Sequence, residues 1–579
     1  MPRQGLLRLV CNSLKAPASF HLSPSSFTST ISRTTGFAPR RNLSIGTGSS
    51  SDLFEYTSGR WIYNDCLRRA ERRLVFDVEG LSQLAAESVG RSPADVVKIS
   101  KLAEGGANRI FLITLQDDFQ MIARIPYPVT IPKYYAVASE VATMESLRSS
   151  GLPVPEVYGY SPTPDNAAKT EYIFMEFMKG VKLSDVWMEL GEPDVASVLS
   201  QVVQLETKMM SLSFPAGGSI YYSHDLEKMP GVLTIPLKDE RFCVGPDTRL
   251  PMWFGRRSQL DIDRGPYRNP QEVLSAAAVK EVAYLEKFGR PLLPFNRWRR
   301  FAYQFQPQSP SAHIDNLRRY LLMAPSIVPK DPALNRFCLR HPDLQQSNII
   351  VHWSPDSGWQ VVSLLDWQHA SVLPLFLVAG VPQRLQNYND PVSQSMTPPS
   401  LPENIDELEE DDRAAAMDVH HRRLAYYHYV WNTAHYNEPH YNAAIDPTRV
   451  LRRRLFNHAG YPWEGETLEL KVALIEATQR WAELTDGGSS CPVVFDSDDV
   501  RETMDVNEVQ AQMDSTFELW QDMVGAGPEG WVHTEHYEAA VARCKQVKED
   551  VLAKCTSDEE RAEILEHWPW DDMDEGDYS

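Results

Sequence analysis

The sequence predicts an α+β protein in which a small antiparallel sheet with one helix precedes a larger, mostly helical part. Three apolar runs separated by short turns, residues 97–102, 110–115 and 120–125, are typical of consecutive strands. An amphipathic pattern predicts a helix over 133–148, and a further strand is expected over 171–178. This order of elements differs from the regular strand–helix alternation of a doubly wound sheet.

Changes in composition along the chain divide it into segments. The first is free of acidic residues, the second and the last are helical in pattern, and the last also carries acidic runs. The expected segments are a presequence (1–43), a helical N-terminal extension (44–95), an N-terminal lobe (96–178), a C-terminal lobe (179–390) and an acidic helical region (391–579).

The composition excludes several classes of protein. The 579 residues are 42% hydrophobic and carry a formal net charge of -21, so the chain can bury a large core while its surface repels nucleic acid. An acidic surface suits a soluble protein or one whose small substrate is cationic. The seven cysteines lack metal-ligand spacing, and their odd number argues against a disulfide framework. The longest apolar stretch, 372–382, is too short to span a bilayer.

The first 51 residues contain no Asp or Glu but carry six Arg and Lys residues among many Ser and Thr. This composition is typical of a mitochondrial presequence, whereas a secretory signal needs a continuous apolar stretch. Arg41 precedes Leu43-Ser44 at the spacing of a matrix-protease site, so we expect cleavage after Leu43 and a matrix location. The alternative is an N-terminus that is merely disordered.

The most informative stretch runs from Leu339 to Val351 and has an Asp and an Asn five positions apart, Asp343 and Asn348. An apolar strand follows, turns near 354–358, and returns to end at Asp366. Because antiparallel strands reverse direction, Asp366 should lie at the same end of the hairpin as the other two side chains. Three oxygen-bearing groups that converge in this way suit phosphoryl transfer, although Asp and Asn also cap turns.

His341-x-Asp343-x-x-x-x-Asn348, followed by a hairpin and Leu365-Asp366-Trp367, resembles the catalytic loop and metal site of the aminoglycoside phosphotransferase family. The resemblance implies a bilobal, protein-kinase-like fold that uses ATP and Mg²⁺. It implies that Asp343 acts on an acceptor hydroxyl and that Asn348 and Asp366 bind the metal. His341 is expected to organise the loop by hydrogen bonds.

The N-terminal lobe carries features that fit a nucleotide site. Gly105-Gly106 resembles a nucleotide-covering loop, although a plain hairpin turn has the same residues. Arg124 stands where a kinase strand carries its phosphate-binding lysine, and Glu140 is its expected ion-pair partner, with Glu145 as the alternative. The segment from Glu176 to Met178 resembles the hinge whose backbone reads adenine, and a core strand ending in a turn is the other interpretation.

The resemblance covers about residues 96–374. Phe54–Asn64 and Phe214–Ile220 resemble a fungal subgroup of the family, the altered inheritance of mitochondria protein 9 group. Gln368 replaces an acid or glycine of many relatives, which puts a second metal site in doubt. The sequence therefore favours an ATP- and Mg²⁺-dependent kinase of a small hydroxylated metabolite. The alternative is a catalytically idle, nucleotide-binding or scaffold protein that supports mitochondrial maintenance. A protein kinase is disfavoured because no Ala-Pro-Glu segment follows Asp366.

Overall fold

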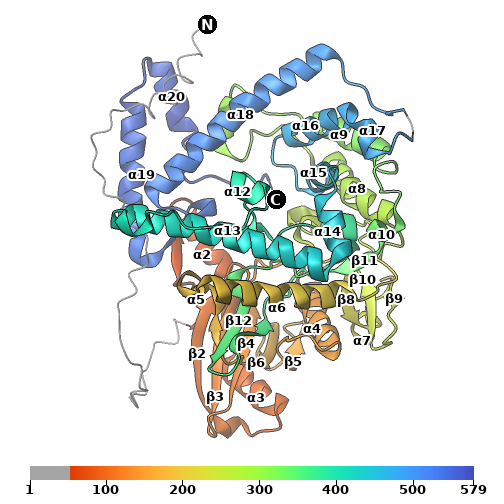
Figure 1. The fold of residues 1–579 in the computed structure, drawn as a ribbon, viewed down its shortest axis with the longest axis vertical. Helices are drawn as coiled ribbons and strands as arrows, with labels where there is room; N and C mark the ends of the chain where they lie inside the picture. The colour runs from red at the N-terminus through yellow and green to blue at the C-terminus, as the bar shows by residue number, and fades with distance from the viewer. Residues whose placement is uncertain (1–52, 489, 579) are drawn as a thin grey trace.

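The computed structural model describes residues 53–488 and 490–578, so the predicted presequence lies outside the described residues. Its first unit is a five-stranded antiparallel sheet in the order β2-β3-β4-β6-β5 (Figure 1). The strands are β2 Val96–Glu104, β3 Asn108–Leu115, β4 Gln120–Pro126, β5 Val157–Ser161 and β6 Tyr172–Glu176. The four predicted strands are confirmed to within a few residues. The prediction missed β5, which is half-buried along its whole length and therefore lacks an alternating pattern.

Helices pack on both faces of this sheet, whereas the sequence predicted one. Helix α4, Lys133–Ser149, shares a core with Ile122 of β4. Helix α3, Val78–Ser88, covers the other face and buries Leu81 against the strand residues Phe111 and Ala123. Neighbouring residues of β4 thus enter different cores, because successive side chains of a strand point to opposite faces. Helix α3, which belongs to the predicted N-terminal extension, is therefore packed on the sheet.

Local signals explain where these two helices begin and end. The Asp77 side chain accepts a hydrogen bond from the backbone N–H of Gly80 at 2.9 Å, which caps the start of α3. Helix α4 ends before Gly151, whose φ of 75° is a left-handed conformation that glycine adopts without steric cost. The end of α4 agrees with the helix predicted over 133–148.

The second unit is built mainly from helices around three small sheets. In one of them β10 Phe242–Gly245 lies between β8 Ser219–Tyr222 and β9 Ile235–Pro236. β7 Val181–Lys182 and β13 Gly358–Leu364 flank β12 Ile349–Ser354, and β11 Phe337–Leu339 pairs with β14 Val372–Pro374. The long helices α6, Glu192–Met210, and α13, Glu410–Tyr436, lie side by side (Figure 1). The apolar stretch from Val372 forms β14 and α11 Leu375–Val378, both largely buried. Among the described residues, no helix is both long and apolar enough to cross a membrane.

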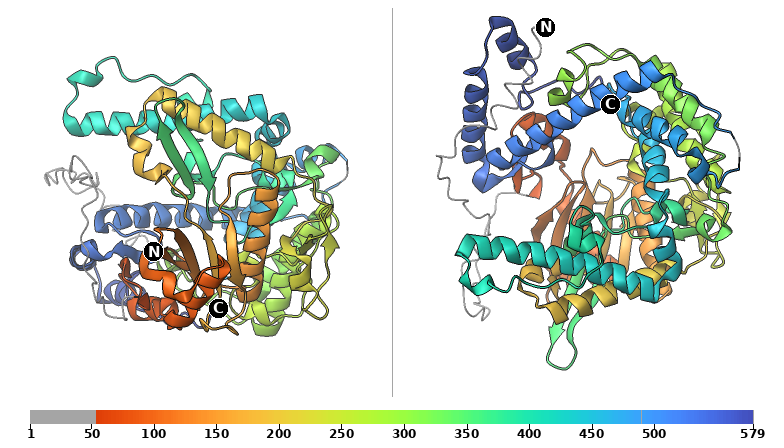
Figure 2. Two further views of the ribbon diagram at one scale, coloured as in Figure 1. Left: turned by 90° about the horizontal axis from the view of Figure 1, so that it is seen from below. Right: turned by 45° about the horizontal axis from the view of Figure 1, so that its top comes forward.

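The remaining helices of eight or more residues after α6 form an arc whose last part lies against the first described strand (Figures 1 and 2). They are α8 Pro270–Phe288, α9 Pro310–Met323, α14 Glu438–Ile445, α15 Arg449–Gly460, α16 Leu468–Gln479, α18 Ser497–Val524, α19 Tyr537–Leu552 and α20 Asp558–Glu566. Near the end of the arc, β15 Trp531–His533 pairs with β1 Gly59–Trp61, just before α2 Asp65–Arg72. The sequence predicted the helices but not this contact between the two ends. The six described cysteines are free.

Replacement of Leu81 by Ala tests whether α3 belongs to the folding unit of the sheet. Leu81 is fully buried, so the cavity should lower the free energy of unfolding by about 2–5 kcal/mol. Denaturant unfolding followed by tryptophan fluorescence measures this change. Glu79→Ala, at an exposed position of the same helix, is the matched control and should change little. Equal stability of the two variants would show that α3 folds independently of the sheet.

Candidate active site

The loop between β11 and β12, residues 340–348, lies against the end of the β12–β13 hairpin. The backbone N–H of Leu365 donates to the Asn348 carbonyl at 2.8 Å. His341 Nδ1 accepts from the N–H of Asp343 at 3.1 Å, so its proton lies on Nε2, which donates to the Leu365 carbonyl at 2.8 Å. Burial lowers the pKa of His341 and favours this neutral form. His341 thus ties the loop to the residue before Asp366, as the sequence predicted.

Asp343 is exposed, and neighbouring amides hold its carboxylate. Asn348 Nδ2 donates to the Asp343 backbone carbonyl at 2.9 Å and to Oδ2 at 3.2 Å, and Gln345 Nε2 donates to Oδ2 at 2.5 Å. Within residues 53–488 and 490–578, Asp343 Oδ1 and the Asn348 amide oxygen have no hydrogen-bond partner. The loop therefore orients two oxygen atoms and leaves them free to interact with other groups.

Asp366 follows β13 in a left-handed conformation, with a φ of 66°. A non-glycine residue held there costs on the order of 1–3 kcal/mol, and such strain is concentrated at functional sites. The Asp366 side chain is 45% exposed, and its Oδ1 lies 2.7 Å from Arg124 Nη2. Burial acts to raise the pKa of Asp366, but the charge and hydrogen bond of Arg124 outweigh it, and the pKa is lowered. Asp366 is therefore ionised at neutral pH.

Arg124 is buried at the centre of the site, between two acids. Its Nη1 donates to Glu140 Oε1 at 2.6 Å, and its Nη2 donates to Asp366 and to Gln368 Oε1 at 2.7 and 3.0 Å. The predicted pairing with Glu140 is confirmed, while Glu145 contacts Ser149 instead. Burial raises the pKa of Glu140 to about 7 against the opposing effect of Arg124. One guanidinium thus links the sheet, α4 and the residue that follows the hairpin.

The Gly105-Gly106 turn closes the β2–β3 hairpin, because the N–H of Gly105 donates to the Asn108 carbonyl at 2.9 Å. The Asn108 side chain lies between Gln368 and Arg124. Its amide is 2.6 Å from Gln368 Oε1, and with the amide turned over its oxygen accepts from Arg124 Nη2 and Nε at 2.7 and 3.1 Å. The turn thus joins two paired strands, as both interpretations of its sequence require. Through Asn108, the base of the turn also contacts Arg124 and Gln368.

The segment after β6 joins the two units of the chain. The N–H of Glu176 donates to the Glu156 carbonyl at 2.8 Å, and the Glu176 carboxylate accepts from the N–H of Glu156 at 3.2 Å. Met178 follows, half-buried, before β7. Glu176 thus binds the edge strand of the sheet through its side chain, and nucleotide contacts by Gly105, Gly106, Glu176 and Met178 stay predictions.

The region that contains this geometry matches a model described as the phosphotransferase enzyme family, over residues 98–376. Residues 98–376 form a phosphotransferase-family domain. The match agrees closely with the extent of the resemblance that the sequence motifs indicated. It covers the sheet, the loop with Asp343 and Asn348, and Asp366.

Two fungal proteins are similar to the chain well beyond the phosphotransferase domain. A subtelomeric hrmA-associated cluster protein of Aspergillus fumigatus is 29% identical over 515 residues, which cover 82% of this chain and 97% of that protein. Altered inheritance of mitochondria protein 9, mitochondrial, of Yarrowia lipolytica is 23% identical over 522 residues, 84% of this chain and 85% of that protein. The predicted resemblance to this subgroup is confirmed.

Two solved structures are also similar to the chain. One is a streptomycin–ATP–APH(2")-IIa ternary complex, with 12% identity, coverage of 67% of this chain and 94% of that chain, and a TM-score of 0.31. The other is choline kinase from Cryptosporidium parvum, with 11% identity, coverage of 71% and 97%, and a TM-score of 0.27.

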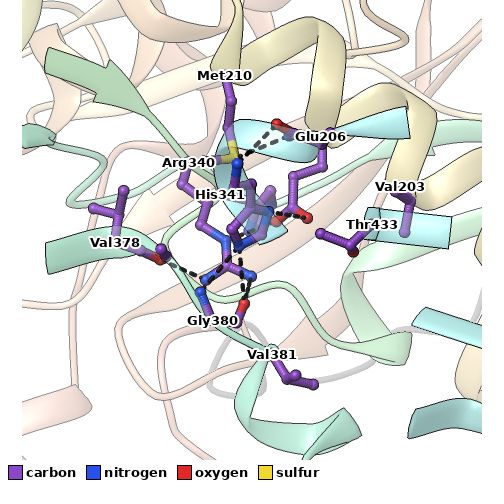
Figure 3. A network of polar contacts seen from close by, with 12 residues as sticks. Val203, Glu206, Met210, Arg340, His341, Val378, Gly380, Val381 and Thr433 are labelled. Carbon is purple, nitrogen blue, oxygen red and sulfur yellow. Dashed lines mark hydrogen bonds and ion pairs between the residues drawn. The ribbon is translucent and has the colours of Figure 1, made fainter. Parts of the chain in front are cut away.

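A buried charged network holds the start of the loop of the phosphotransferase domain (Figure 3). Arg340, the residue before His341, donates through Nε to Glu206 at 2.6 Å and through Nη1 and Nη2 to the carbonyls of Val378 and Gly380 at 2.7 and 2.6 Å. Tyr429 of α13 accepts from Arg340 Nη2 at 3.0 Å and donates to Glu206 at 2.5 Å. Helices α6 and α13 are thereby tied to the start of the loop.

Sequence reasoning missed Arg340 as a support and Asn108 as a neighbour of Arg124, and it treated Gln368 only as a departure from the family pattern. Two of them had a local signal, since Arg340 directly precedes His341 and Asn108 follows the glycine turn. Their partners are distant in sequence: Glu206 is 134 residues from Arg340, and Gln368 is 260 from Asn108. Pairs of this kind become visible only in the folded chain.

Arg340→Met should lower the free energy of unfolding by about 3–5 kcal/mol, because it leaves the Glu206 carboxylate buried without its cation. Chemical denaturation measures the change, with Arg384→Met at an exposed position as the control. Adding Glu206→Gln removes the unpaired charge and should restore part of the lost stability. If the double variant is less stable than Arg340→Met alone, charge pairing is not what the network contributes.

Proposed function

We propose that the protein is an ATP- and Mg²⁺-dependent phosphotransferase whose acceptor is the hydroxyl group of a small molecule. The observation that carries the proposal is a chain of hydrogen bonds in which Arg124 joins Glu140 to Asp366. This chain lies beside the loop that contains Asp343 and Asn348. Phosphoryl transfer depends mainly on positioning and electrostatic stabilisation, and this arrangement supplies both. A phosphotransferase-family domain over residues 98–376 supports the same reaction class.

Asp343 is the proposed base. Its Oδ1 is unengaged among the described residues, and Gln345 and Asn348 fix the orientation of its carboxylate. An acceptor hydroxyl would donate its hydrogen bond to Oδ1 and pass its proton there as its oxygen forms the bond to the γ-phosphorus. The bond between that phosphorus and the β,γ-bridging oxygen breaks, and ADP leaves with the electron pair. Arg124, always charged, would offset the negative charge of the phosphates.

Asn348 and Asp366 are the proposed Mg²⁺ ligands. Mg²⁺ prefers hard oxygen ligands and is commonly bound by one or two protein groups together with phosphate oxygens and water. The donor set fits, because Asp366 is an ionised carboxylate and the Asn348 amide oxygen has no hydrogen-bond partner among the described residues. When bound, the metal would neutralise phosphate charge. Asp366 would then exchange part of its interaction with Arg124 for the metal.

The acceptor is proposed to be a small hydroxylated compound, and the net charge of -21 favours a cationic one. The proposed location is the mitochondrion. It is supported by the Arg-bearing, acid-free first 51 residues and by the word mitochondrial in the name of the Yarrowia lipolytica relative. The scaffold alternative predicts the same location and the same fold, so variants of the site must separate the two functions.

Two substitutions should separate nucleotide binding from chemistry. Asp366→Ala removes a proposed metal ligand and should abolish the Mg²⁺-dependent part of ATP affinity, measured by calorimetric titration with and without Mg²⁺. Asp343→Asn should leave ATP affinity nearly unchanged but lower turnover about a hundredfold or more, the usual contribution of a positioned base. Turnover is measured as ATP consumption with the acceptor identified in a metabolite screen.

Asp356→Asn is the matched control, since Asp356 is exposed in the turn at the far end of the same hairpin. A strain that lacks the protein should be rescued by Asp356→Asn and not by Asp343→Asn. Full rescue by Asp343→Asn would contradict the enzyme and favour the scaffold, because a scaffold needs the fold but not the base.

Deletion of residues 1–43 should leave the protein in the cytosol, because it removes all six basic residues of the proposed presequence. Fluorescence microscopy of a C-terminally tagged chain and fractionation of mitochondria measure the location. Replacing only Arg3 and Arg8 by Gln should weaken import without shortening the chain. Mitochondrial location of the deleted form would exclude targeting by this segment.

A further inference from the structure

Residues 53–64, here called the N-terminal strap, cross the base of the glycine turn. The N–H groups of Thr57 and Ser58 both donate to Glu104 Oε2 at 2.8 Å, and their hydroxyls donate to the same oxygen at 3.1 and 2.8 Å. Glu104 is the last residue of β2 and directly precedes Gly105. The strap therefore binds the chain at the point where it enters the turn.

The other carboxylate oxygen of Glu104 is held by two cations. Lys101 Nζ lies 2.9 Å and Arg109 Nε 3.4 Å from Oε1, and the Glu104 side chain is 1% exposed. Lys101 Nζ also donates to the Thr57 hydroxyl at 2.8 Å. A carboxylate so deeply buried is stable only when its hydrogen bonds are satisfied, and the strap supplies four of them. Glu104, Lys101 and the strap form one unit.

The same strap residues bind the C-terminal part of the chain through their carbonyls. Thr534 Oγ1 donates to the Thr57 carbonyl at 2.7 Å, and the N–H of Thr534 donates to the Ser58 carbonyl at 3.2 Å. Next to them, β1 pairs with β15, and a Cβ placed on Gly59 would lie 2.2 Å from the Trp531 ring nitrogen. The strap thus connects the β15 region to Glu104, with its N–H groups on one partner and its carbonyls on the other.

The tip of the glycine turn has little packing of its own. A Cβ placed on Gly106 would lie more than 4 Å from the other described atoms, and one on Gly105 would meet only the Asn108 carbonyl, at 3.6 Å. The position of the turn is therefore set by its base. On one side the base is Glu104, and on the other it is Asn108, which reaches Arg124.

We propose that Glu104 is a positioning residue for the nucleotide phosphates and that the strap, fixed by β15, holds it in place. This inference rests on the proposed function, since it assigns a role to the turn as a phosphate-covering loop. It also gives the Phe54–Asn64 motif and the C-terminal region a role in the site: they set the affinity for the phosphates without touching the nucleotide.

The test compares MgATP with adenosine on the full chain by calorimetric titration, because adenosine has no phosphates. The double variant Thr57→Ala/Ser58→Ala removes the two hydroxyl donors to Glu104 and should weaken MgATP binding about threefold to tenfold. Its affinity for adenosine should stay unchanged. Thr57→Ser/Ser58→Thr keeps both hydroxyls and is the matched control, which should bind MgATP like the wild type.

Gly59→Val acts at the other end of the strap, where its side chain would collide with Trp531. It should cause the same selective loss of MgATP affinity. If one of the two variants fails to fold, the other still tests the role of the strap. Thermal unfolding of each variant is recorded in parallel.

The outcomes are distinguishable. Failure of the wild type to bind MgATP would contradict the proposed function. Wild-type binding of MgATP with unchanged affinity in both strap variants would overturn the positioning role. Equal losses for MgATP and adenosine would also overturn it, because a strap that only stabilises the fold does not discriminate phosphates.

Discussion

The buried guanidinium of Arg124 is the interaction on which the rest of the site depends. A buried cation is tolerated only when acids accompany it, and here one acid comes from α4 and the other from the residue after the hairpin. Sheet, helix and hairpin must therefore be in place together for the charge to be balanced. Because Leu365 is bonded to both His341 and Asn348, the order imposed on Asp366 extends to the exposed loop.

Buried acids paired with arginine also occur beneath the two loops of the site. Glu206 under the loop and Glu104 under the glycine turn are both buried acids held by an arginine and by hydroxyl groups. In contrast, the side chains of Asp343, the proposed base, and Asn348, a proposed metal ligand, take part only in amide hydrogen bonds and leave oxygen atoms free. Buried ion pairs thus hold the supporting residues in place, whereas the side chains of Asp343 and Asn348 remain able to exchange partners.

The sequence predicted those contacts that follow from short spacing along the chain or from the packing of consecutive elements. Asp343, Asn348 and Asp366 were brought together by the reversal of one hairpin, and Arg124 met Glu140 because a strand and the next helix pack in sequence order. Strand β5 was not predicted because all of its residues are half-buried, so buried and exposed positions do not alternate along it. The buried residues that support the site could not be predicted. In a salt bridge such as Arg340–Glu206, the sequence around each residue gives no sign of its partner. Tertiary packing, not propensity, selects such partners.

The pairing of β1 with β15 also constrains the order in which the protein is assembled. The Tyr56 hydroxyl and the Trp531 indole that donates to it are 475 residues apart, so the first described strand has no partner until nearly all of the chain exists. A chain made from its N-terminus can fold its sheet and the central helices early, whereas closure of this long loop must come late. Nascent protein would therefore acquire its core well before the two ends meet, and the last event of maturation would be the locking of the glycine turn.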